Sequence, residues 1–490
     1  MDRRQMRIAF ATVGCRLNQF ETDALRARAQ AEGHEIVPFE AAADVYVINT
    51  CTITAEADAD SRRLVRQAVR RNPPALVAVT GCYAQAAPEA VAAIPGVDLV
   101  LGNGEKPLLL AHVQAATKNG GPRVYVRDAK DGRELDGYGP GIDPDRTRAF
   151  LKVQDGCNYR CSFCIVPNVR GGNRSQRPDG ILAEIRRLQA AGFPEIVLTG
   201  IHLGTYGRDL LPPTSLADLC LRIASLDEAP RIRLSSLDPH EVKPDLIRLL
   251  ADSPRFCRHL HLPLQSGDER ILRRMRRGHT AAQFRDLVER LATEVPGIAV
   301  SGDVIVGFPG EDDEAFQRTY DLLEGLPIAG LHVFSYSRRT GTEAAEYPHQ
   351  VPKAVKGERS RRLETLAARK AQAFRRRILG ETLTVVVLDR DGPDGLLEGL
   401  SDNYVRVWFA GDPGLRGGIA TVRAEAVTGR GLLGSVCGAL DVRSPACLPR
   451  RRASFARAQT ASLEPERSRE ITARLTILPG QSSRSGRDDP

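Results

Sequence analysis

The chain has 490 residues, of which 42% are hydrophobic and 27% are charged, as in an ordinary soluble globular protein of two or three domains. Its first residues lack the apolar stretch of a secretion signal, and no apolar run is long enough to cross a membrane, so we expect a cytoplasmic protein with no membrane partner. The formal net charge of +8 lies partly in the residues after 440 and does not alone indicate a nucleic-acid ligand.

The first part of the chain alternates short apolar runs with helical patterns. Strands are expected at 8–13, 44–49 and 75–80, and helices at 18–32 and 57–71. This alternation predicts a small parallel α/β domain over residues 5–117. The Gly-, Pro- and Asp-rich residues 118–145 are expected to form a linker with one hairpin strand at 124–126.

A cysteine stands at or just past the end of each of these three strands, namely Cys15, Cys51 and Cys82. In open parallel sheets, ligands bind at the carboxyl edge of the strands. Three thiols delivered to one edge therefore suggest a metal site. The alternative is a set of three buried structural cysteines.

Residues 146–378 repeat the strand–helix pattern with greater regularity. Six strands are expected, at 150–153, 195–199, 231–235, 259–262, 299–306 and 331–334. Helices such as 179–191, 215–225 and 281–293 fall between them. Six units are fewer than the usual eight, so the pattern predicts an open or partial (β/α)6 barrel. A closing helix at 353–377 carries ten Lys or Arg.

Beyond this helix the pattern changes to Val- and Thr-rich segments at 381–388, 404–409 and 419–427, separated by Gly and Asp turns. They predict a small antiparallel β-barrel over residues 379–440. Residues 441–490 show little periodicity and are expected to be disordered. The basic helix, with Tyr404 and Trp408 for stacking, suggests an RNA-binding face; the alternative is a solvated helix with core aromatics. A run of arginines between 273 and 277 is a further candidate for phosphate contact.

A short loop after the first barrel strand holds Cys157, Cys161 and Cys164, with three and then two residues between them. Three thiolates can bind three irons of a cubane cluster and leave the fourth iron open to a small molecule. The alternatives are a zinc loop completed by a remote residue and chance clustering.

Polar or glycine-rich turns follow the later barrel strands, where a barrel builds its site. We expect them to bind one cofactor shared with the cysteine loop, through Gly200, His202, Ser235, Gln265 and Val306. For His202, His259 and His261, hydrogen bonding is favoured over metal ligation, because cysteines already account for the metals. No side-chain acid or base is assigned.

The cysteine loop resembles the signature of the radical S-adenosylmethionine (SAM) family. The resemblance implies that Cys157, Cys161 and Cys164 hold a [4Fe–4S] cluster whose open iron chelates SAM. Electron transfer then cleaves SAM to a 5′-deoxyadenosyl radical. Phe163 has the place of the family's aromatic beside the last cysteine, where a ring edge packs by the adenine. Ordinary loop packing is the alternative for Phe163.

The chain to about residue 437 resembles a radical SAM methylthiotransferase, with a three-cysteine N-terminal domain, a radical SAM barrel and a C-terminal TRAM β-barrel. This implies an auxiliary [4Fe–4S] cluster on Cys15, Cys51 and Cys82. Segments 14–22, 49–54, 80–85, 200–207 and 332–338 are similar to one branch of the family. That branch modifies C2 of N6-threonylcarbamoyladenosine in tRNA, beside the anticodon.

The resemblance implies a reaction in which one SAM methylates a sulfur on the auxiliary cluster. A second SAM gives the radical that removes hydrogen from the adenine ring before the methylthio group is transferred. The implied partners are tRNA and a reducing protein or flavodoxin-type electron donor, with the sulfur donor open. Rival substrates are N6-isopentenyladenosine in tRNA and an aspartate of a ribosomal protein. Outside the class, a zinc-containing RNA-binding protein is the alternative.

Overall fold

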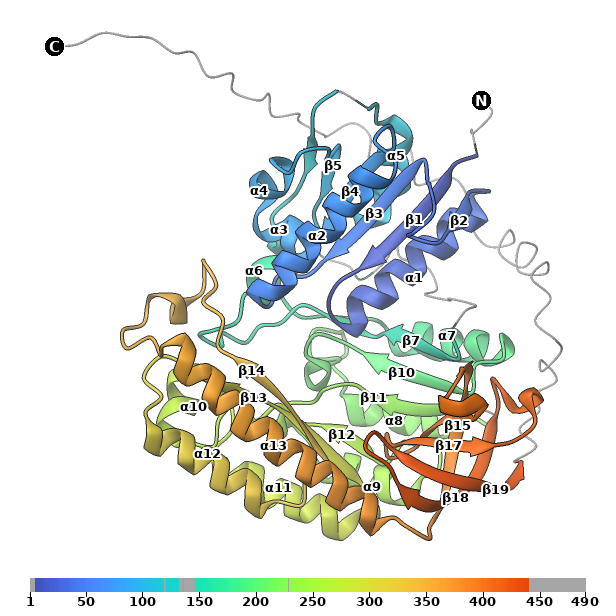
Figure 1. Cartoon of the computed structure of the whole chain (residues 1–490), viewed down its shortest axis with the longest axis vertical. Helices are drawn as coiled ribbons and strands as arrows, with labels where there is room; N and C mark the ends of the chain where they lie inside the picture. The colour runs from blue at the N-terminus through green and yellow to red at the C-terminus, as the bar shows by residue number, and fades with distance from the viewer. Residues whose placement is uncertain (1–4, 119, 132–134, 136–145, 228, 440–490) are drawn as a thin grey trace. The chain divides into compact units, whose positions relative to one another are not determined.

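The computed structural model describes residues 5–118, 120–131, 135, 146–227 and 229–439, all within one unit of the chain, residues 1–447 (Figure 1). The expected disordered tail at 441–490 and most of the expected linker lie outside the described residues. Over the described ranges, none of the helices combines the length and the apolar character needed to span a membrane.

The N-terminal domain is a parallel sheet covered by helices on both faces. Its strand order is β2-β1-β3-β4-β5-β6. The strands are β1 (Arg7–Thr12), β2 (Glu35–Val37), β3 (Val45–Thr50), β4 (Leu76–Gly81), β5 (Leu99–Leu101) and β6 (Arg123–Tyr125). One face packs on α1 (Arg16–Ala31) and α5 (Leu109–Ala115). The other packs on α2 (Ala55–Arg71), α3 (Cys82–Ala86) and α4 (Pro88–Ala92).

The central strand β3 shows why helices pack on both faces of the sheet. Val45 and Val47 point into one core cluster, and Tyr46 and Ile48 point into the other. All six residues of β3 are buried, as a strand buried on both faces requires. The chain passes from β1 outward to β2 and then back across to β3. The sheet therefore changes direction between β1 and β3, where open sheets bind their ligands.

The prediction of a hairpin strand at 124–126 is wrong, because the strand found there does not form a hairpin. Strand β6 lies parallel to β5, with Leu99 opposite Arg123 and Leu101 opposite Tyr125. Helix α5 provides the crossover that a parallel connection needs. The N-terminal sheet thus continues into the first residues of the segment expected to be a linker.

The central domain has the six predicted barrel strands in sequence order. They are β7 (Arg148–Lys152), β10 (Glu195–Thr199), β11 (Arg231–Leu234), β12 (His259–His261), β13 (Ala299–Val306) and β14 (Gly330–Ser335). They form two parallel sheets, β11-β10-β7 and β12-β13-β14, joined where Ile232 bridges Phe256. The partial barrel is therefore confirmed. The surrounding helices include α6 (Val166–Arg170), α7 (Pro178–Ala190), α8 (Leu216–Ala224), α9 (Pro244–Asp252), α10 (Glu269–Met275), α11 (Ala281–Glu294) and α12 (Asp313–Gly325).

Helix α13 (Lys353–Arg377) has the predicted bounds, and part of its positive charge holds it in place. Arg359 is buried and pairs with Glu311 at 2.7 Å, and Arg369 pairs with Glu324 of α12. Lys370 donates to the carbonyl of Leu326 at 2.8 Å. Its basic residues are therefore not all available to a ligand.

The C-terminal domain is a closed five-stranded barrel, drawn in orange and red in Figure 1. Its strands are β15 (Thr382–Asp391), β16 (Leu397–Ser401), β17 (Arg406–Ala410), β18 (Ile419–Val427) and β19 (Leu432–Ala439). The pairs are antiparallel except β17 with β19, which is parallel. Strands β16 and β19 are additional to the three predicted segments.

Trp408 is not the stacking residue that the sequence suggested. Its side chain is only 6% exposed, because Gly392 and Gly431 let backbone close over the indole ring. A Cβ atom at Gly392 would lie 2.4 Å from the indole Cδ1. Trp408 is therefore a buried residue of the small barrel and is not available to stack on an RNA base.

Two arginines of β11 dock the small barrel on the central domain. Arg231 donates to the carbonyls of Thr384 and Leu400, each at 2.9 Å. Arg233 donates to the carbonyls of Ser401 and Asp402, at 3.0 and 2.9 Å. The buried Glu195 carboxylate balances both charges. Although burial raises the pKa of Glu195, these arginines hold it well below its usual range.

Candidate functional site

Cys15, Cys51 and Cys82 meet at the carboxyl edge of the N-terminal sheet, after β1, β3 and β4. Gly14 makes the first approach possible: its φ is +112°, and a Cβ there would lie 2.8 Å from the Cβ of Cys51. Cys51 and Cys82 are buried, whereas Cys15 keeps accessible surface because it lines a cavity. The three predicted ligands are thus brought together at the point where the sheet changes direction.

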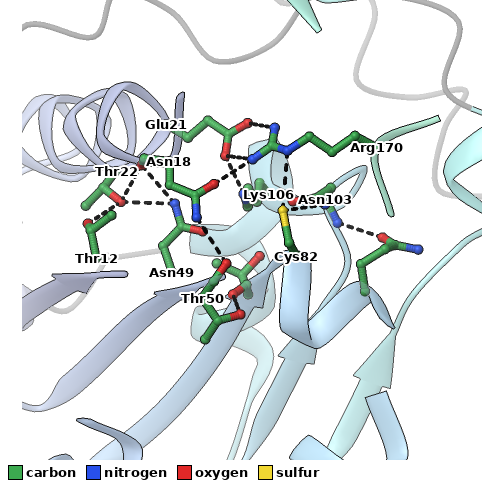
Figure 2. A network of polar contacts seen from close by, with 12 residues as sticks. Thr12, Asn18, Glu21, Thr22, Asn49, Thr50, Cys82, Asn103, Lys106 and Arg170 are labelled. Atoms are coloured by element: carbon green, nitrogen blue, oxygen red, sulfur yellow. Dashed lines mark hydrogen bonds and ion pairs between the residues drawn. The ribbon is translucent and has the colours of Figure 1, made fainter. Parts of the chain in front are cut away.

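A buried polar network surrounds Cys82, as Figure 2 shows. Arg170 of α6 donates through Nε to Cys82 Sγ at 3.4 Å and through Nη1 to Glu21 Oε1 at 2.7 Å. Its Nη2 donates to Asn18 Oδ1 at 2.6 Å, and Lys106 also pairs with Glu21. Burial raises the pKa of Glu21, but the neighbouring cations outweigh it and hold the pKa well below the usual range. The network ties the N-terminal domain to the barrel beside Cys82, one of the predicted ligands.

The second set of cysteines lies on the loop between β7 and α6. Cys157 donates its backbone N–H to the Gly171 carbonyl at 3.0 Å, and Cys164 donates to the Cys161 carbonyl at 3.0 Å. Gly156 has φ +72°, and a Cβ there would stand 1.8 Å from the Gly172 carbonyl oxygen. Only glycine therefore lets the loop start in this position.

The thiols of both sets suit a cationic centre. Burial, with a smaller contribution from the other cysteines of each set, raises the pKa of Cys51 and of Cys164 to about 12. Burial also raises the pKa of Cys15 and Cys161. Thiols of this kind become thiolate ligands only beside a positive centre, which an iron–sulfur cluster supplies.

The spacing of the thiols favours clusters over single ions. Within the described ranges, the groups whose ligand atoms all lie within 4.8 Å of one another consist of histidines and carboxylates, without a cysteine. Thiolates on one tetrahedral zinc stand about 3.8 Å apart, given Zn–S bonds of about 2.3 Å. Cysteines that each bind a different iron of a cubane are farther apart. In the described structure, neither set of three thiols has the spacing of a single zinc site.

The six predicted cofactor contacts divide into three groups. Gly200 and Ser235 line the cavity that Cys15 also lines, and the buried Ser235 hydroxyl has no hydrogen-bond partner in the described structure. His202 instead lies against the cysteine loop, with Nδ1 3.2 Å from Cys157 Sγ and Nε2 2.8 Å from Glu241 Oε2. In the structure His202 thus hydrogen-bonds to the first cysteine of the loop.

The remaining predicted contacts lie in loop core and sheet. Phe163 packs edge-on against Phe308, with ring centroids 6.5 Å apart. Gln265 has φ +72° and donates its N–H to the Asp303 carbonyl at 2.8 Å. The Val306 carbonyl accepts from the Tyr336 N–H at 2.8 Å. These three residues do not line the cavity.

The cavity has a volume of about 800 Å³ and is bounded by all three domains. The N-terminal domain contributes residues 14–17, including Cys15. Turns after β10 and β11 contribute Gly200 and Ser235, and the loop before β17 contributes Tyr404. A molecule of nucleoside size therefore fits between Cys15, the barrel turns and the small barrel.

Tyr404 is the aromatic centre of the cavity wall. Its ring lies 4.6 Å from that of His259, and the guanidinium carbon of Arg233 lies 4.8 Å from the ring centroid. Its hydroxyl accepts a hydrogen bond from Arg16 Nη2 at 3.0 Å. Although burial raises the pKa of Tyr404, the surrounding arginines outweigh it and lower the pKa. The sequence marked this residue for stacking, and the structure places it in the cavity wall with 37% of its surface exposed.

Histidines on the same wall form hydrogen bonds, as expected from the sequence. His259 and His261 both reach the Ser301 hydroxyl, at 3.3 and 3.0 Å. His261 Nε2 and His332 Nδ1 lie 2.9 and 3.1 Å from Asp303 Oδ1. Burial raises the pKa of Asp303, but these hydrogen bonds and the histidine charges lower it to about 2.

Two arginines of the run at 273–277 are engaged in ion pairs within the protein. Arg277 pairs with Asp238 at 2.8 Å and donates to Cys161 Sγ at 3.5 Å, and Arg276 pairs with Glu343 at 2.7 Å. The run supports the cysteine loop instead, since Ser162 also donates its N–H to the Met275 carbonyl.

Sequence reasoning missed Arg16, Arg170 and Glu21 as site residues. Arg16 directly follows Cys15, so adjacency to a ligand was the available signal. Arg170 and Glu21 carried no such signal, because their contact joins positions 149 residues apart.

Two family models match the chain. The model described as "Radical SAM superfamily" covers residues 151–323, and "Uncharacterized protein family UPF0004" covers residues 7–102. Among solved structures, a radical SAM methyltransferase, TsrM, from Kitasatospora setae is similar at a TM-score of 0.50 and 18% identity, over 70% of this chain and 77% of that one. This similarity concerns the fold alone.

Curated relatives extend the match to all three domains. The "Threonylcarbamoyladenosine tRNA methylthiotransferase MtaB" of Bacillus subtilis is 39% identical, over 85% of this chain and 93% of its own. The protein of the same name from Aquifex aeolicus is 39% identical over 82% and 96%. The "tRNA-2-methylthio-N(6)-dimethylallyladenosine synthase" of Moorella thermoacetica is 34% identical over 84% and 94%. Because identity of this degree spans most of each protein, the chain belongs to the radical SAM tRNA methylthiotransferase family.

Proposed function

We propose that the enzyme transfers a methylthio group to C2 of N6-threonylcarbamoyladenosine beside the anticodon of tRNA. The cofactors of its family are SAM and [4Fe–4S] clusters. One observation carries the proposal: the chain folds two separate three-cysteine sets, and Cys15 of one set lines a nucleoside-sized cavity. Gly200 of the same lining lies two residues before His202, whose Nδ1 is 3.2 Å from Cys157 Sγ of the other set. The Bacillus subtilis and Aquifex aeolicus relatives, both named for threonylcarbamoyladenosine, support the substrate.

In this proposal, Cys157, Cys161 and Cys164 hold the cluster that binds SAM, and Cys15, Cys51 and Cys82 hold the auxiliary cluster. When bound, these groups supply the radical that removes the ring hydrogen and the sulfur that replaces it. The protein supplies position: Arg277 donates to Cys161 Sγ and Arg170 donates to Cys82 Sγ.

The chain's own residues also shape where the base goes. Gly200 and Ser235 provide a close backbone approach and a free hydroxyl in the cavity. Tyr404 supplies an aromatic face within reach of a base. An aromatic C–H bond is too weak an acid for a side-chain base, so no residue is assigned to proton removal.

The partners follow from the reaction. We propose a cytoplasmic enzyme that takes electrons from a reducing protein of flavodoxin type, since its tRNA substrate is found there. The exposed part of α13 beside the small barrel is the proposed contact for the tRNA backbone.

The test is methylthiolation of defined tRNAs by the anaerobically reconstituted enzyme, followed by mass spectrometry of the nucleosides. The proposal expects the methylthio product from tRNA that carries N6-threonylcarbamoyladenosine. If product forms only from tRNA with N6-dimethylallyladenosine, the substrate is instead the nucleoside for which the Moorella thermoacetica relative is named. Product only on a ribosomal-protein aspartate would remove tRNA as the substrate.

A further inference from the structure

The cavity that Cys15 lines carries an excess of positive charge. Its charged lining residues are one aspartate, Asp303, and four arginines, Arg16, Arg375, Arg406 and Arg430. The aspartate is already engaged, because two histidines lie 2.9 and 3.1 Å from its Oδ1. Such a cavity favours a ligand that brings negative charge of its own.

Arg16 is the arginine next to a cysteine ligand. It begins α1 directly after Cys15, and its Nη2 donates to the Tyr404 hydroxyl at 3.0 Å. Its guanidinium carbon lies 5.7 Å from the Tyr404 ring centroid. Within the described part of the chain, no carboxylate pairs with it. A guanidinium has five N–H donors in a planar fork, so most of its capacity remains for a ligand.

A buried nitrogen in the same wall also lacks a partner. His259 is 3% exposed, and its Nε2 lies 3.3 Å from the Ser301 hydroxyl. Its Nδ1 has no hydrogen-bond partner among the residues that the structure describes. The ring of Tyr404 connects this nitrogen to Arg16, since it packs 4.6 Å from the His259 ring. Buried polar atoms are nearly always paired, and His259 lines the cavity, so the unpaired Nδ1 is a candidate partner for a ligand there.

Location separates Arg16 from the other three arginines of the cavity. Arg375 belongs to α13, and Arg406 and Arg430 belong to the small barrel. Arg406 lies 3.6 Å from Glu398. These positions suit the RNA backbone, which a basic outer surface binds without distinguishing bases. Arg16 stands beside the proposed auxiliary cluster, where the modified base itself has to be held.

We propose that Arg16 binds the carboxylate of the threonylcarbamoyl group and thereby selects this nucleoside. The inference rests on the proposed function. A guanidinium and a carboxylate form a bidentate pair, and the Tyr404 hydrogen bond fixes the plane of the Arg16 fork for it. A dimethylallyl group offers neither charge nor acceptor. It would leave the Arg16 guanidinium without a carboxylate and the buried His259 Nδ1 without a partner, which disfavours that nucleoside.

The test is the affinity of the reconstituted holoenzyme for two anticodon stem-loop RNAs. One carries N6-threonylcarbamoyladenosine and the other carries its methyl ester, which has nearly the same shape without the charge. The wild type is expected to bind the acid roughly 10- to 100-fold more tightly than the ester. Arg16→Gln is expected to bind both RNAs equally, and Arg16→Lys to keep part of the preference.

Arg406→Gln is the matched control, because it removes a cavity arginine of the small barrel. This variant is expected to weaken the binding of both RNAs by the same factor. The ratio of the two affinities should therefore stay unchanged. The role of Arg16 is overturned if Arg16→Gln keeps the full preference for the acid over the ester. If the wild type methylthiolates the acid-bearing RNA in that case, the proposed function still stands. If the wild type neither prefers nor methylthiolates the acid-bearing RNA, both the role of Arg16 and the proposed function are overturned. Loss of SAM affinity in Arg16→Gln, with the RNA ratio intact, also overturns the inference.

Discussion

Arg170 and Cys82 lie in different domains, yet the arginine Nε donates a hydrogen bond to the cysteine Sγ at 3.4 Å. The same guanidinium pairs with Glu21 of the N-terminal domain and with Asp155 of the central domain, at 2.7 and 3.2 Å. One buried side chain thus connects a proposed ligand of one cluster to the short helix that follows the cysteine loop of the other. We infer that this contact fixes the positions of the two cysteine sets relative to each other.

Replacing Arg170 by Gln is expected to lower the free energy of unfolding by about 3 kcal/mol, since it leaves the buried Glu21 and Asp155 short of a partner. Urea unfolding measures the change. The control is Arg222→Gln, which removes a 2.6 Å pair with Asp179 whose side chains are 48% and 89% exposed. That exposed pair contributes about 0–1 kcal/mol. Equal losses in the two variants would contradict the role of Arg170.

The cavity carboxylate Asp303 predicts a pH dependence of stability. Burial raises its pKa, but hydrogen bonds from His261 and His332 outweigh this and lower the pKa from 3.8 to about 2. A group whose pKa is lower in the folded state stabilises the protein above its unfolded pKa. Its contribution is lost as the pH falls from about 4 to 2.

Asp303→Asn is therefore expected to be about 2 kcal/mol less stable than wild type at neutral pH, with the difference vanishing near pH 2. Urea unfolding at a series of pH values follows this difference. Asp179→Asn, at a carboxylate that is 89% exposed, serves as the control and should track wild type throughout. A difference for Asp303→Asn that does not change with pH would show that its histidine contacts do not set its titration.

Helix α13 offers a test of tRNA backbone contact. Arg376 is exposed, and no carboxylate within the described ranges pairs with it, whereas Arg369 pairs with Glu324. Arg376→Gln is expected to weaken tRNA binding and to reduce the slope of log K against log salt by about one. Arg369→Gln is expected to change the slope less. Binding titrations at several salt concentrations measure this slope. An unchanged slope for Arg376→Gln would show that Arg376 does not contact the tRNA backbone.

The sequence predicted those parts of the structure that depend on local pattern. The six barrel strands, the bounds of α13 and the cysteines at strand ends all follow from periodicity and spacing. Contacts between distant segments were not accessible in this way. Arg233 lies between Ile232 and Leu234 in β11, and its partner Ser401 is 168 residues away, so nothing near it in the sequence indicates which segment it docks.

Local pattern also misplaced individual aromatics. Trp408 and Tyr404 lie in one β-type segment, and composition alone made both candidates for stacking. Glycines at positions 392 and 431 closed the barrel over the tryptophan, whereas Tyr404 has φ +66° in the preceding turn and points into the cavity. The difference is one of backbone conformation, which the alternation of residues does not encode.

The central claim is that the two cysteine sets have separate tasks. It is tested by quantifying 5′-deoxyadenosine and methylthiolated adenosine in the same reaction for wild type, Cys51→Ala and Cys161→Ala. The account predicts that Cys51→Ala still cleaves SAM but inserts no sulfur, and that Cys161→Ala does neither. Methylthiolated adenosine from the Cys51→Ala enzyme would contradict it.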